Sequence, residues 1–451
     1  MGLEIGPNGR TVDFYVIDMG VTDGDRQDRF SASVALDGRE QSVDGRPQAP
    51  RVAARDAAAG SGEHAAMGVA LTLAGSSREV APPNPWVGAV VLGGDGERYE
   101  GCTAAPGGPH AEVRALAAAG GRARGATLVT TLEPCCHTGR TPPCTDAIID
   151  AGVARVVVGV LDPDPNVRGG GVEALRRAGV EVAVGLRAAE VAAQLAPYLK
   201  HRRTGRPWVV LKLAATLDGR TAAPDGTSRW ITGAEARRDA HELRAQSDAV
   251  LVGAGTVRAD DPALTVRRDG SVESRQPLRV VLGHVAEGAR VRPALEIEGD
   301  LGEVLDELGR REVLQVLVEG GARVAHAFHA AGLVDRYVIY LAPALAGGSD
   351  GRPIFDGSGA ASIAGFWRGS IVDVRPVGGD LRIEIAPLVA AAPGVEVTTD
   401  ARTAAVSSPA VQTPSTPTPS TPTPSTPTPS RPTPSRPTPA PGASVAGGAA
   451  A

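Results

Sequence analysis

Two short motifs hold the residues of this sequence that are best suited to chemistry. The first, PHAE, contains His110 and Glu112, and the second, EPCCHTGRTPPC, contains Cys135 and Cys144. An imidazole and two thiolates are typical zinc ligands, and a catalytic zinc site uses three protein ligands so that water can take the fourth position. Glu112 is then free to move a proton between that water and a leaving group. We therefore predict one zinc ion (Zn2+) per chain, bound by His110, Cys135 and Cys144, with Glu112 as the catalytic acid and base.

This combination is typical of the zinc deaminases, which act on an amine-bearing carbon of a nucleobase-like ring. Their second ligand pair usually reads P-C-x-x-C, whereas eight residues separate Cys135 from Cys144 in this chain. The longer loop contains His137 and Arg140, and a guanidinium group binds phosphate bidentately. The spacing therefore favours an anionic substrate held beside the metal.

Three motifs in the same order resemble the deaminase half of the bifunctional riboflavin-biosynthesis deaminase/reductase family. They are PNPWVG at 83–88, HAE at 110–112 and PCCHTGRTPPC at 134–144. The resemblance implies that Asn84, His137 and Arg140 position the deaminase substrate. It also places the second zinc ligand directly after the proline, which favours Cys135 over Cys136.

Other interpretations of these side chains stay open. Cys102 and Cys136 are most simply small buried hydrophobic residues. A closed structural zinc site built from His110, His137 and the cysteines is the alternative to a catalytic one, but it leaves Glu112 without a role.

Composition indicates an intracellular enzyme of two domains. The chain has 451 residues, of which 42% are hydrophobic and 22% charged, enough for two full cores. Its four cysteines suit a reducing compartment, and we expect a cytoplasmic protein. The net charge of -5 argues against nucleic-acid binding, and the sequence lacks an apolar run long enough for a membrane span. We also expect a homo-oligomer, although the sequence does not give the number of subunits.

The composition changes along the chain and predicts four segments. Residues 1–59 are rich in Gly, Asp and Arg and read as a disordered extension. We assign 60–203 to a zinc-dependent pyrimidine deaminase domain and 204–392 to an NADPH-dependent reductase domain. Residues 393–451 contain a Ser-Thr/Arg-Pro-Thr-Pro repeat that starts at Ser415, and they are predicted to be a disordered tail, because proline removes amide donors and the segment has little to bury.

Apolar and polar segments alternate through both central segments and predict an α/β fold. The expected strands are 86–92, 126–132, 155–160, 208–213, 249–253 and 278–282, and the expected helices include 65–74, one opening at His110, one starting at Thr145 and one ending at Arg244. Such alternation implies mostly parallel sheets covered by helices. The resemblance makes the first domain a cytidine-deaminase-like three-layer domain and the second a dihydrofolate-reductase-like domain.

The resemblance also assigns residues of the second domain, which lacks a G-x-G-x-x-G motif of its own. It implies NADPH contacts at Ala214, Trp230, Thr256, Asp260 and Gly321. It implies substrate contacts at Ser228, Arg244, Leu264, Arg267 and Glu319. Arg244 and Arg267 are expected to clamp the substrate phosphate. The chain departs from the family at Gly283-His284, where many members have Asp-Ser, so a cofactor contact there is in doubt.

These observations predict a bifunctional enzyme that acts on small phosphoribosyl pyrimidines. The first reaction is hydrolytic deamination of 2,5-diamino-6-(5-phosphoribosylamino)pyrimidin-4(3H)-one. The second is NADPH-dependent reduction of the ribosyl group of 5-amino-6-(5-phosphoribosylamino)uracil. Two other readings stay open: a deaminase of free or polymeric nucleobases with an unrelated second domain, and a non-catalytic scaffold braced by zinc.

Overall fold

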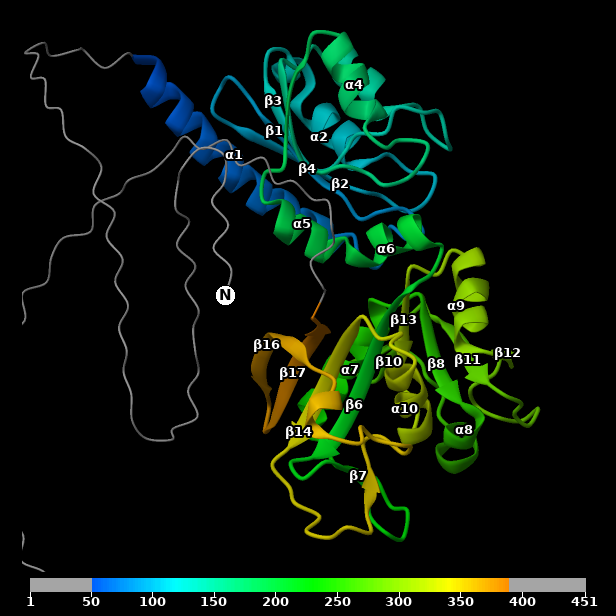
Figure 1. The fold of residues 1–451 in the computed structure, drawn as a ribbon. Coiled ribbons are helices and arrows are strands. Elements are labelled where there is room, and N and C mark those ends of the chain that lie inside the picture. Colours follow the sequence, from blue (N-terminus) through cyan, green and yellow to red (C-terminus); the bar gives the residue numbers. More distant parts are fainter. Residues whose placement is uncertain (1–50, 389–451) are drawn as a thin grey trace, which may run out of the picture. The chain divides into compact units, whose positions relative to one another are not determined.

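The computed structural model describes residues 51–388, which contain two separate α/β sheets. The elements around the first sheet are α1 (Arg51–Ser76), β1 (Gly88–Leu92), β2 (Arg98–Cys102), α2 (Ala111–Ala119), a short 3-10 helix (Gly120–Ala123), β3 (Thr127–Leu132), α3 (Cys144–Asp150), β4 (Arg155–Val160), α4 (Gly170–Arg177), β5 (Glu181–Val184), α5 (Ala188–Gln194) and α6 (Ala196–Thr204). Figure 1 shows these elements in blue to green.

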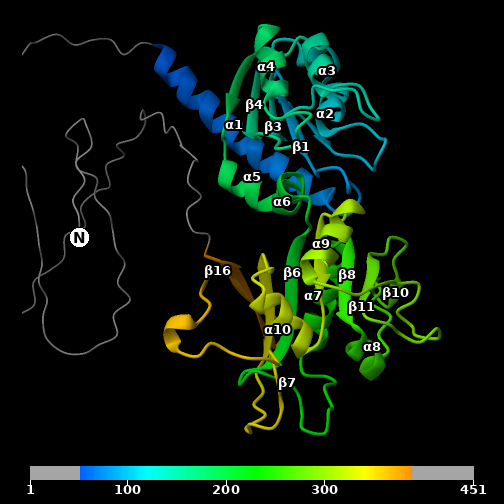
Figure 2. The same ribbon diagram turned by 45° about the vertical axis from the view of Figure 1, so that its right-hand side comes forward.

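The first sheet has five strands in the order β2-β1-β3-β4-β5. Strands β3, β4 and β5 run parallel, whereas β1 pairs antiparallel with both β2 and β3. Helices α1 and α5 contact one face, and α2 covers β1 and β2 with α3 and α4 beside it (Figure 2). The result is the predicted three-layer arrangement, with an antiparallel hairpin β1-β2 that the apolar pattern did not predict.

Two glycines let the helices approach this sheet closely on both faces. A Cβ atom on Gly88 would lie 1.9 Å from the carbonyl oxygen of Ala70 in α1. A Cβ atom on Gly101 would lie 2.2 Å from the carbonyl oxygen of Ala111 in α2. Neither position therefore accepts a side chain without moving a helix. The second contact lies at the start of α2, which carries Glu112 and directly follows His110.

The second sheet and its connections follow from residue 208 onward. The elements are β6 (Trp208–Thr216), β7 (Arg220–Ala222), α7 (Ala234–Ala245), β8 (Ala249–Gly253), α8 (Ala254–Asp260), β9 (Arg267–Arg268), β10 (Ser271–Val272), β11 (Leu278–Leu282), β12 (Leu295–Ile297), α9 (Leu301–Arg310), β13 (Gln315–Val318), α10 (Ala322–Ala330), β14 (Arg336–Ala342), β15 (Arg352–Pro353), a 3-10 helix (Ile363–Gly365), β16 (Gly369–Val377) and β17 (Asp380–Pro387). The order of the main sheet is β12-β11-β8-β13-β6-β14-β17-β16.

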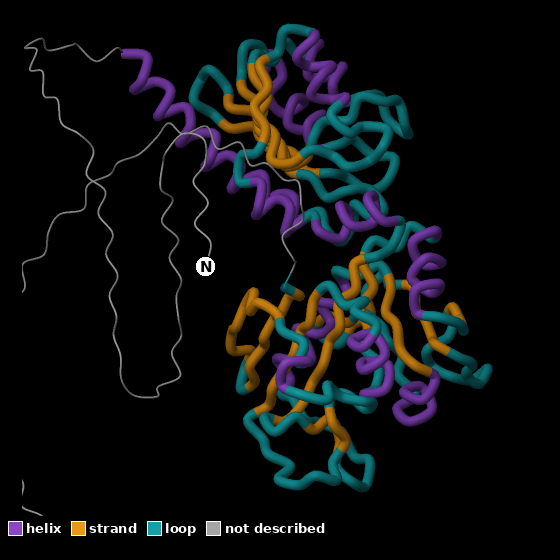
Figure 3. The backbone as a smooth tube through the Cα atoms, in the orientation of Figure 1, coloured by secondary structure: helices purple, strands orange, loops and turns teal. Residues whose placement is uncertain are grey.

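This sheet is parallel except for β17 and β16, which form an antiparallel hairpin at one edge (Figure 3). One face packs on α9 and α10 through a cluster that includes Leu305 and Phe328. The other face packs on α7 and α8 through a cluster that includes Leu243 and Val257. Because β13 lies between β8 and β6, the loops after β8 and β13 meet at the carboxyl edge of neighbouring parallel strands, where ligands bind in open α/β sheets.

The predicted strands 155–160, 249–253 and 278–282 have the same bounds in the structure. The first helix begins at Arg51, nine residues before the predicted start of the folded part. The rest of the predicted N-terminal extension, 1–50, and the predicted tail lie outside the described residues. The predicted boundary between 203 and 204 falls at the end of α6 and stays a prediction. Among the described helices, none is long and apolar enough to cross a membrane.

Candidate active sites

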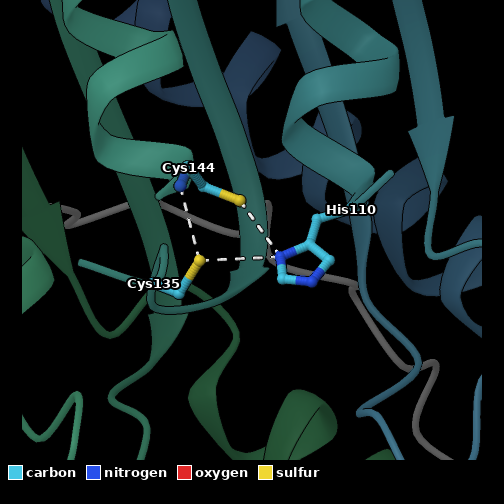
Figure 4. A group of neighbouring side chains, drawn as sticks. All are labelled: His110, Cys135 and Cys144. Atoms are coloured by element: carbon cyan, nitrogen blue, oxygen red, sulfur yellow. Dashed lines mark hydrogen bonds between the residues drawn. The ribbon is translucent and has the colours of Figure 1, made fainter. Parts of the chain in front are cut away.

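Three predicted zinc ligands lie together at one end of the first sheet. Figure 4 shows His110, Cys135 and Cys144 pointing toward one another, and their ligand atoms all lie within 4.8 Å of one another. The His110 Nδ1 atom is 3.2 Å from Cys144 Sγ and 3.6 Å from Cys135 Sγ. Tetrahedral zinc with N and S ligands separates neighbouring ligand atoms by about 3.6 Å. The site therefore fits a zinc ion with three protein ligands.

The local fold explains why residues distant in sequence meet here. His110 is the residue before α2, Cys144 is the first residue of α3, and Cys135 follows β3 by three residues. The amide of Cys144 donates to Cys135 Sγ at 3.4 Å, and helix starts favour thiolates through such amides. Thr141 Oγ1 lies 3.4 Å from His110 Nε2, so the ring nitrogen that faces away from the thiolates has its own partner.

Glu112 lies beside these ligands and is only 4% exposed. Its Oε2 atom is 3.7 Å from Cys144 Sγ. Burial, together with the negative charge of Cys135, raises the pKa of Glu112 to about 7. A carboxyl group with this pKa can both take up and release a proton near neutral pH, as a general acid and base must.

A cavity of about 300 Å³ opens in front of the cluster. Asn84, His137 and Arg140, the predicted substrate residues, all line it. His137 and Arg140 are exposed, and within residues 51–388 the Arg140 guanidinium has no carboxylate partner. The structure thus brings the predicted deaminase residues to one cavity.

The cavity wall also contains Asp162 and Tyr198, which sequence reasoning missed. The Tyr198 hydroxyl donates to Asp162 at 3.0 Å, and both residues are buried. Burial raises the pKa of Asp162 to about 6. No local pattern distinguishes this aspartate from the other acidic residues of its loop, because its burial depends on α6 packing over the loop.

Glu133, the residue after β3, fixes the loop that carries Asp162. It is 3% exposed and accepts hydrogen bonds from the amides of Asp162 at 3.2 Å, Gly169 at 3.0 Å and Val172 at 3.0 Å. One buried carboxylate thus satisfies three amides, two of them around the start of α4. The motif that holds Cys135 therefore also shapes the cavity wall.

The remaining cysteines lie outside the cluster. Cys136 Sγ is 3.8 Å from the carbonyl oxygen of Asn166, and Cys102 Sγ is 3.4 Å from a guanidinium nitrogen of Arg114. Neither belongs to the group of candidate ligands.

A second cavity, of about 320 Å³, lies on the face of the second sheet that α7 covers. The predicted residues Trp230, Arg244, Leu264 and Arg267 line it. Ser228 lines a neighbouring cavity of about 200 Å³, to which Trp230 also contributes. Trp230 is 69% exposed and therefore forms a wall between the two cavities that a flat ligand can stack on.

Arg244 and Glu319 form a bidentate ion pair in this region. Arg244 Nε and one terminal nitrogen donate to the two Glu319 oxygens at 2.6 and 2.8 Å, and the other terminal nitrogen donates to the carbonyl oxygen of Thr265 at 3.1 Å. Burial alone would raise the pKa of Glu319, but Arg244 outweighs burial and the pKa is lowered to about 2. Three of the five Arg244 N–H donors are thus used by protein acceptors.

Lys212 is a further polar residue of this cavity that sequence reasoning did not assign. It lies on β6, half-buried, with its amine 5.7 Å from the centre of the Tyr340 ring. Burial lowers the pKa of Lys212, although the charge of Glu319 opposes the effect. Its position depends on the pairing of β6 with β14, so no local signal marked it.

The predicted cofactor residues Thr256 and Gly321 meet at the carboxyl edge of β8 and β13. The amide of Gly321, which precedes α10, donates to Thr256 Oγ1 at 3.1 Å. A Cβ atom on Gly320 would lie 2.6 Å from the Cβ atom of Val324. A glycine-rich turn that leads into a helix fits a dinucleotide pyrophosphate, which binds backbone amides.

The other predicted cofactor residues lie around this region or on the sheet itself. The carbonyl oxygen of Asp260 accepts a hydrogen bond from Arg229, the neighbour of Trp230, at 2.9 Å. Ala214 lies on β6 opposite Tyr340 of β14. His284, where a cofactor contact was in doubt from the sequence, lies 3.0 Å from Glu296 and is exposed.

Family models match both halves of the chain. The model for the cytidine and deoxycytidylate deaminase zinc-binding region matches residues 61–160, and the model for the RibD C-terminal domain matches residues 207–381. The riboflavin biosynthesis protein RibD of Escherichia coli is 42% identical over 360 residues, which cover 71% of this chain and 98% of that protein. RibD of Mycobacterium tuberculosis is 44% identical over 332 residues, covering 71% of this chain and 96% of that protein.

Solved structures give the same result. RibD of Acinetobacter baumannii is 38% identical, with a TM-score of 0.68, and covers 72% of this chain and 98% of its own. A diaminohydroxyphosphoribosylaminopyrimidine deaminase/5-amino-6-(5-phosphoribosylamino)uracil reductase from Thermotoga maritima is 36% identical, with a TM-score of 0.65 and the same coverage. With relatives this similar over nearly their whole length, and with both family models matched in order, the chain belongs to the RibD family of riboflavin biosynthesis proteins.

Proposed function

We propose that this chain catalyses two consecutive steps of riboflavin synthesis. The first half deaminates 2,5-diamino-6-(5-phosphoribosylamino)pyrimidin-4(3H)-one by hydrolysis. The second half uses NADPH to reduce the ribosyl group of 5-amino-6-(5-phosphoribosylamino)uracil to a ribityl chain. The observation that carries the first step is the cluster of His110, Cys135 and Cys144 with the buried carboxyl of Glu112 beside it.

In the deaminase site, the chain's own residues hold the substrate and move the protons. A zinc ion held by His110, Cys135 and Cys144 would supply a water of lowered pKa as the nucleophile. Glu112 accepts a proton as oxygen adds to the amine-bearing carbon and donates a proton to the amine, which leaves as ammonia. Asn84, His137 and Arg140 line the same cavity and hold the pyrimidine and its phosphate.

In the reductase site, a hydride and a proton must reach the ribosyl group on different atoms. When bound, NADPH would supply the hydride, which must reach the carbon attached to the exocyclic nitrogen. The bond from that carbon to the ring oxygen of the ribose must break, and this oxygen stays on the other ring carbon, takes up a proton and becomes a hydroxyl group. Lys212 lines the cavity, has its pKa lowered by burial, and serves as the proton donor. The Glu319–Arg244 ion pair holds the side chains at this end of the cavity in place.

The cofactor contacts form a second set. Thr256 offers its hydroxyl hydrogen for the pyrophosphate, with its oxygen held by the Gly321 amide, and Trp230 offers a ring for stacking. Ala214 and Asp260 complete the set that the resemblance implied. Ser228, Leu264 and Arg267 contact the substrate.

The decisive experiment follows both products in one assay. Purified protein is given the diaminopyrimidine substrate with and without NADPH, and ammonia and NADPH oxidation are measured. We expect ammonia in both reactions and NADPH oxidation only after deamination. Ammonia release from cytosine or single-stranded DNA instead would support the alternative nucleobase deaminase, and the absence of both products from the zinc-loaded protein would support a scaffold.

We further propose that the chain forms a homo-oligomer in the cytoplasm. A reducing compartment such as the cytoplasm keeps cysteine thiols from pairing as disulfides, so that they stay available as ligands. At the edge strand β16, Ile371 is 68% and Val374 50% exposed, and the nearby Phe366 is 56% exposed. An exposed apolar edge strand is a typical interface. Light scattering of the purified chain tests this proposal, and Ile371→Glu should lower the measured mass if β16 is the interface.

A further inference from the structure

The cavity on the α7 face of the second sheet is strongly cationic. Its cationic side chains are Lys212, Arg237, Arg244, Arg267 and Arg290. Within residues 51–388, no aspartate or glutamate lines it. A pocket with this charge is suited to an anion that carries more than one negative charge, such as a phosphate monoester.

One carboxylate, Glu319, already acts on two of these five cations. Arg244 is held by both oxygens of Glu319, and the same carboxylate acts on Lys212. By contrast, Arg237, Arg267 and Arg290 have no carboxylate within ion-pair distance in the part of the chain that the structure describes. Most of the excess positive charge of the cavity therefore comes from these three guanidinium groups.

The partners of these three residues leave donors free. Arg237 stacks on Trp230, with 4.4 Å between its guanidinium carbon and the ring centre. One of its terminal nitrogens donates a hydrogen bond to a backbone carbonyl oxygen. The Nε atom of Arg267 donates a hydrogen bond to Thr265 Oγ1 at 3.1 Å. The Arg290 guanidinium makes no hydrogen bond to the described residues, and of the three it is the one with all its donors free.

The backbone that carries Arg290 is nevertheless fixed. The amide of Arg290 donates to Asp261 Oδ1 at 2.8 Å, and the next residue, Val291, is fully buried. Arg292 donates to the carbonyl oxygens of Val285 at 3.0 Å and Ala286 at 3.1 Å. A held backbone with an unpaired side chain at a cavity is the arrangement expected of a binding residue rather than of a structural one.

We propose that Arg290 is a further specificity-determining residue of the reductase and binds the substrate phosphate together with Arg237 and Arg267, whereas Arg244 positions Glu319. The inference rests on the proposed reductase function and names residues beyond the implied set. Its chemistry requires only that a phosphate monoester on the ribose reaches a guanidinium that can donate bidentately.

The test compares Arg290→Gln and Arg290→Lys with Arg368→Gln, which removes the same charge from an exposed site of the same domain outside the cavity. Calorimetry measures the binding of ribose 5-phosphate, of ribose as its phosphate-free control, and of NADPH. The KM and kcat for the aminouracil are measured with and without its 5-phosphate.

For Arg290→Gln we expect the KM of the phosphorylated substrate and the Kd of ribose 5-phosphate to rise about tenfold or more, because a charge-assisted hydrogen bond is lost. We expect the KM and Kd of Arg290→Lys to lie between those of wild type and Arg290→Gln. The kcat, the Kd of NADPH and the KM of the phosphate-free substrate should stay unchanged. Equal behaviour of Arg290→Gln and Arg368→Gln overturns the proposal, as does a loss confined to NADPH or shared by the phosphate-free substrate. A wild-type protein that binds ribose 5-phosphate through Arg290 but does not oxidise NADPH would contradict the proposed function and leave the phosphate site standing.

Discussion

At the scale of the residue, Glu112 separates metal binding from proton transfer. Its carboxyl group lies beside Cys144 but is not among the three candidate ligands. We predict that Glu112→Ala keeps one zinc per chain and lowers the deamination rate by about 10² to 10⁴, the usual contribution of a general acid and base. Ammonia release and zinc content by atomic absorption provide the two measurements.

The exposed Glu100→Ala on β2 is the matched control and should leave both unchanged. Loss of zinc from Glu112→Ala would show that the carboxylate is a ligand. Reduction of the preformed aminouracil should survive in every case.

Asp162 gives a prediction about stability and pH. Its pKa is raised to about 6 by burial, whereas an aspartate in the unfolded chain titrates near 3.9. The folded state therefore binds more protons between about pH 4 and pH 6, so stability falls as pH rises through this window. Asp162→Asn removes the cost of the buried charge. At pH 8 it should therefore increase the free energy of unfolding by at most about 3 kcal/mol and raise the unfolding midpoint accordingly.

Thermal unfolding of wild type, Asp162→Asn and the exposed control Asp150→Asn at pH 4 and pH 8 checks this expectation. The advantage of Asp162→Asn should vanish at pH 4, where the wild-type carboxyl is protonated. A variant that is less stable than wild type at pH 8 would mean that Tyr198 stabilises the charge more than burial destabilises it.

How much of the site the sequence predicted depends on the kind of residue. His110, Cys135 and Cys144 could be identified because metal ligands come in motifs of fixed spacing. Lys212 and Arg290 could not, because they reach one cavity only after β6 and the loop after β11 are placed by the sheet. A local pattern carries no information about such long-range contacts.

At the scale of the element, Glu133 connects β3 to the loop and helix that follow β4. Glu133→Gln replaces one carboxylate oxygen by a donor that faces a backbone amide, so we predict a loss of about 1.5 to 3 kcal/mol of stability. Because this loop carries Asp162 of the cavity wall, the KM of deamination should rise while zinc content stays at one per chain.

Thermal unfolding and deaminase kinetics measure both effects. Glu173→Gln, on the exposed side of α4, is the control and should behave as wild type. A normal KM in Glu133→Gln despite lower stability would show that the loop does not shape the substrate site.

The strands show which elements a sequence can predict. Residues 249–253 form a continuous apolar run and 278–282 a run interrupted only by Arg279, because parallel strands inside the sheet are covered on both faces, and such runs are easily identified. Strands β16 and β17 were missed, since their residues are largely exposed or half-buried and their apolar residues are mixed with charges. Strand β2 was missed for the same reason, being short, charged and at the sheet edge.

At the scale of the whole molecule, the two candidate sites are built from different sheets and different residues. We predict that a chelator that removes zinc abolishes ammonia release and leaves NADPH-dependent reduction of preformed aminouracil unchanged. Added Zn2+ should restore deamination. Parallel loss of both activities in a protein that keeps its circular-dichroism spectrum would show that the second site depends on the metal.

The loop between Cys135 and Cys144 is closed at its base. The amide of Thr145 donates to the carbonyl oxygen of Cys135 at 3.2 Å, and the amide of Cys144 donates to Cys135 Sγ at 3.4 Å. Because these bonds join the two ends of the loop, residues can be inserted between them at small entropic cost without moving either ligand. In evolution, an enzyme of this architecture can thus acquire a new substrate range by lengthening one loop, while the metal and the proton carrier stay as they were.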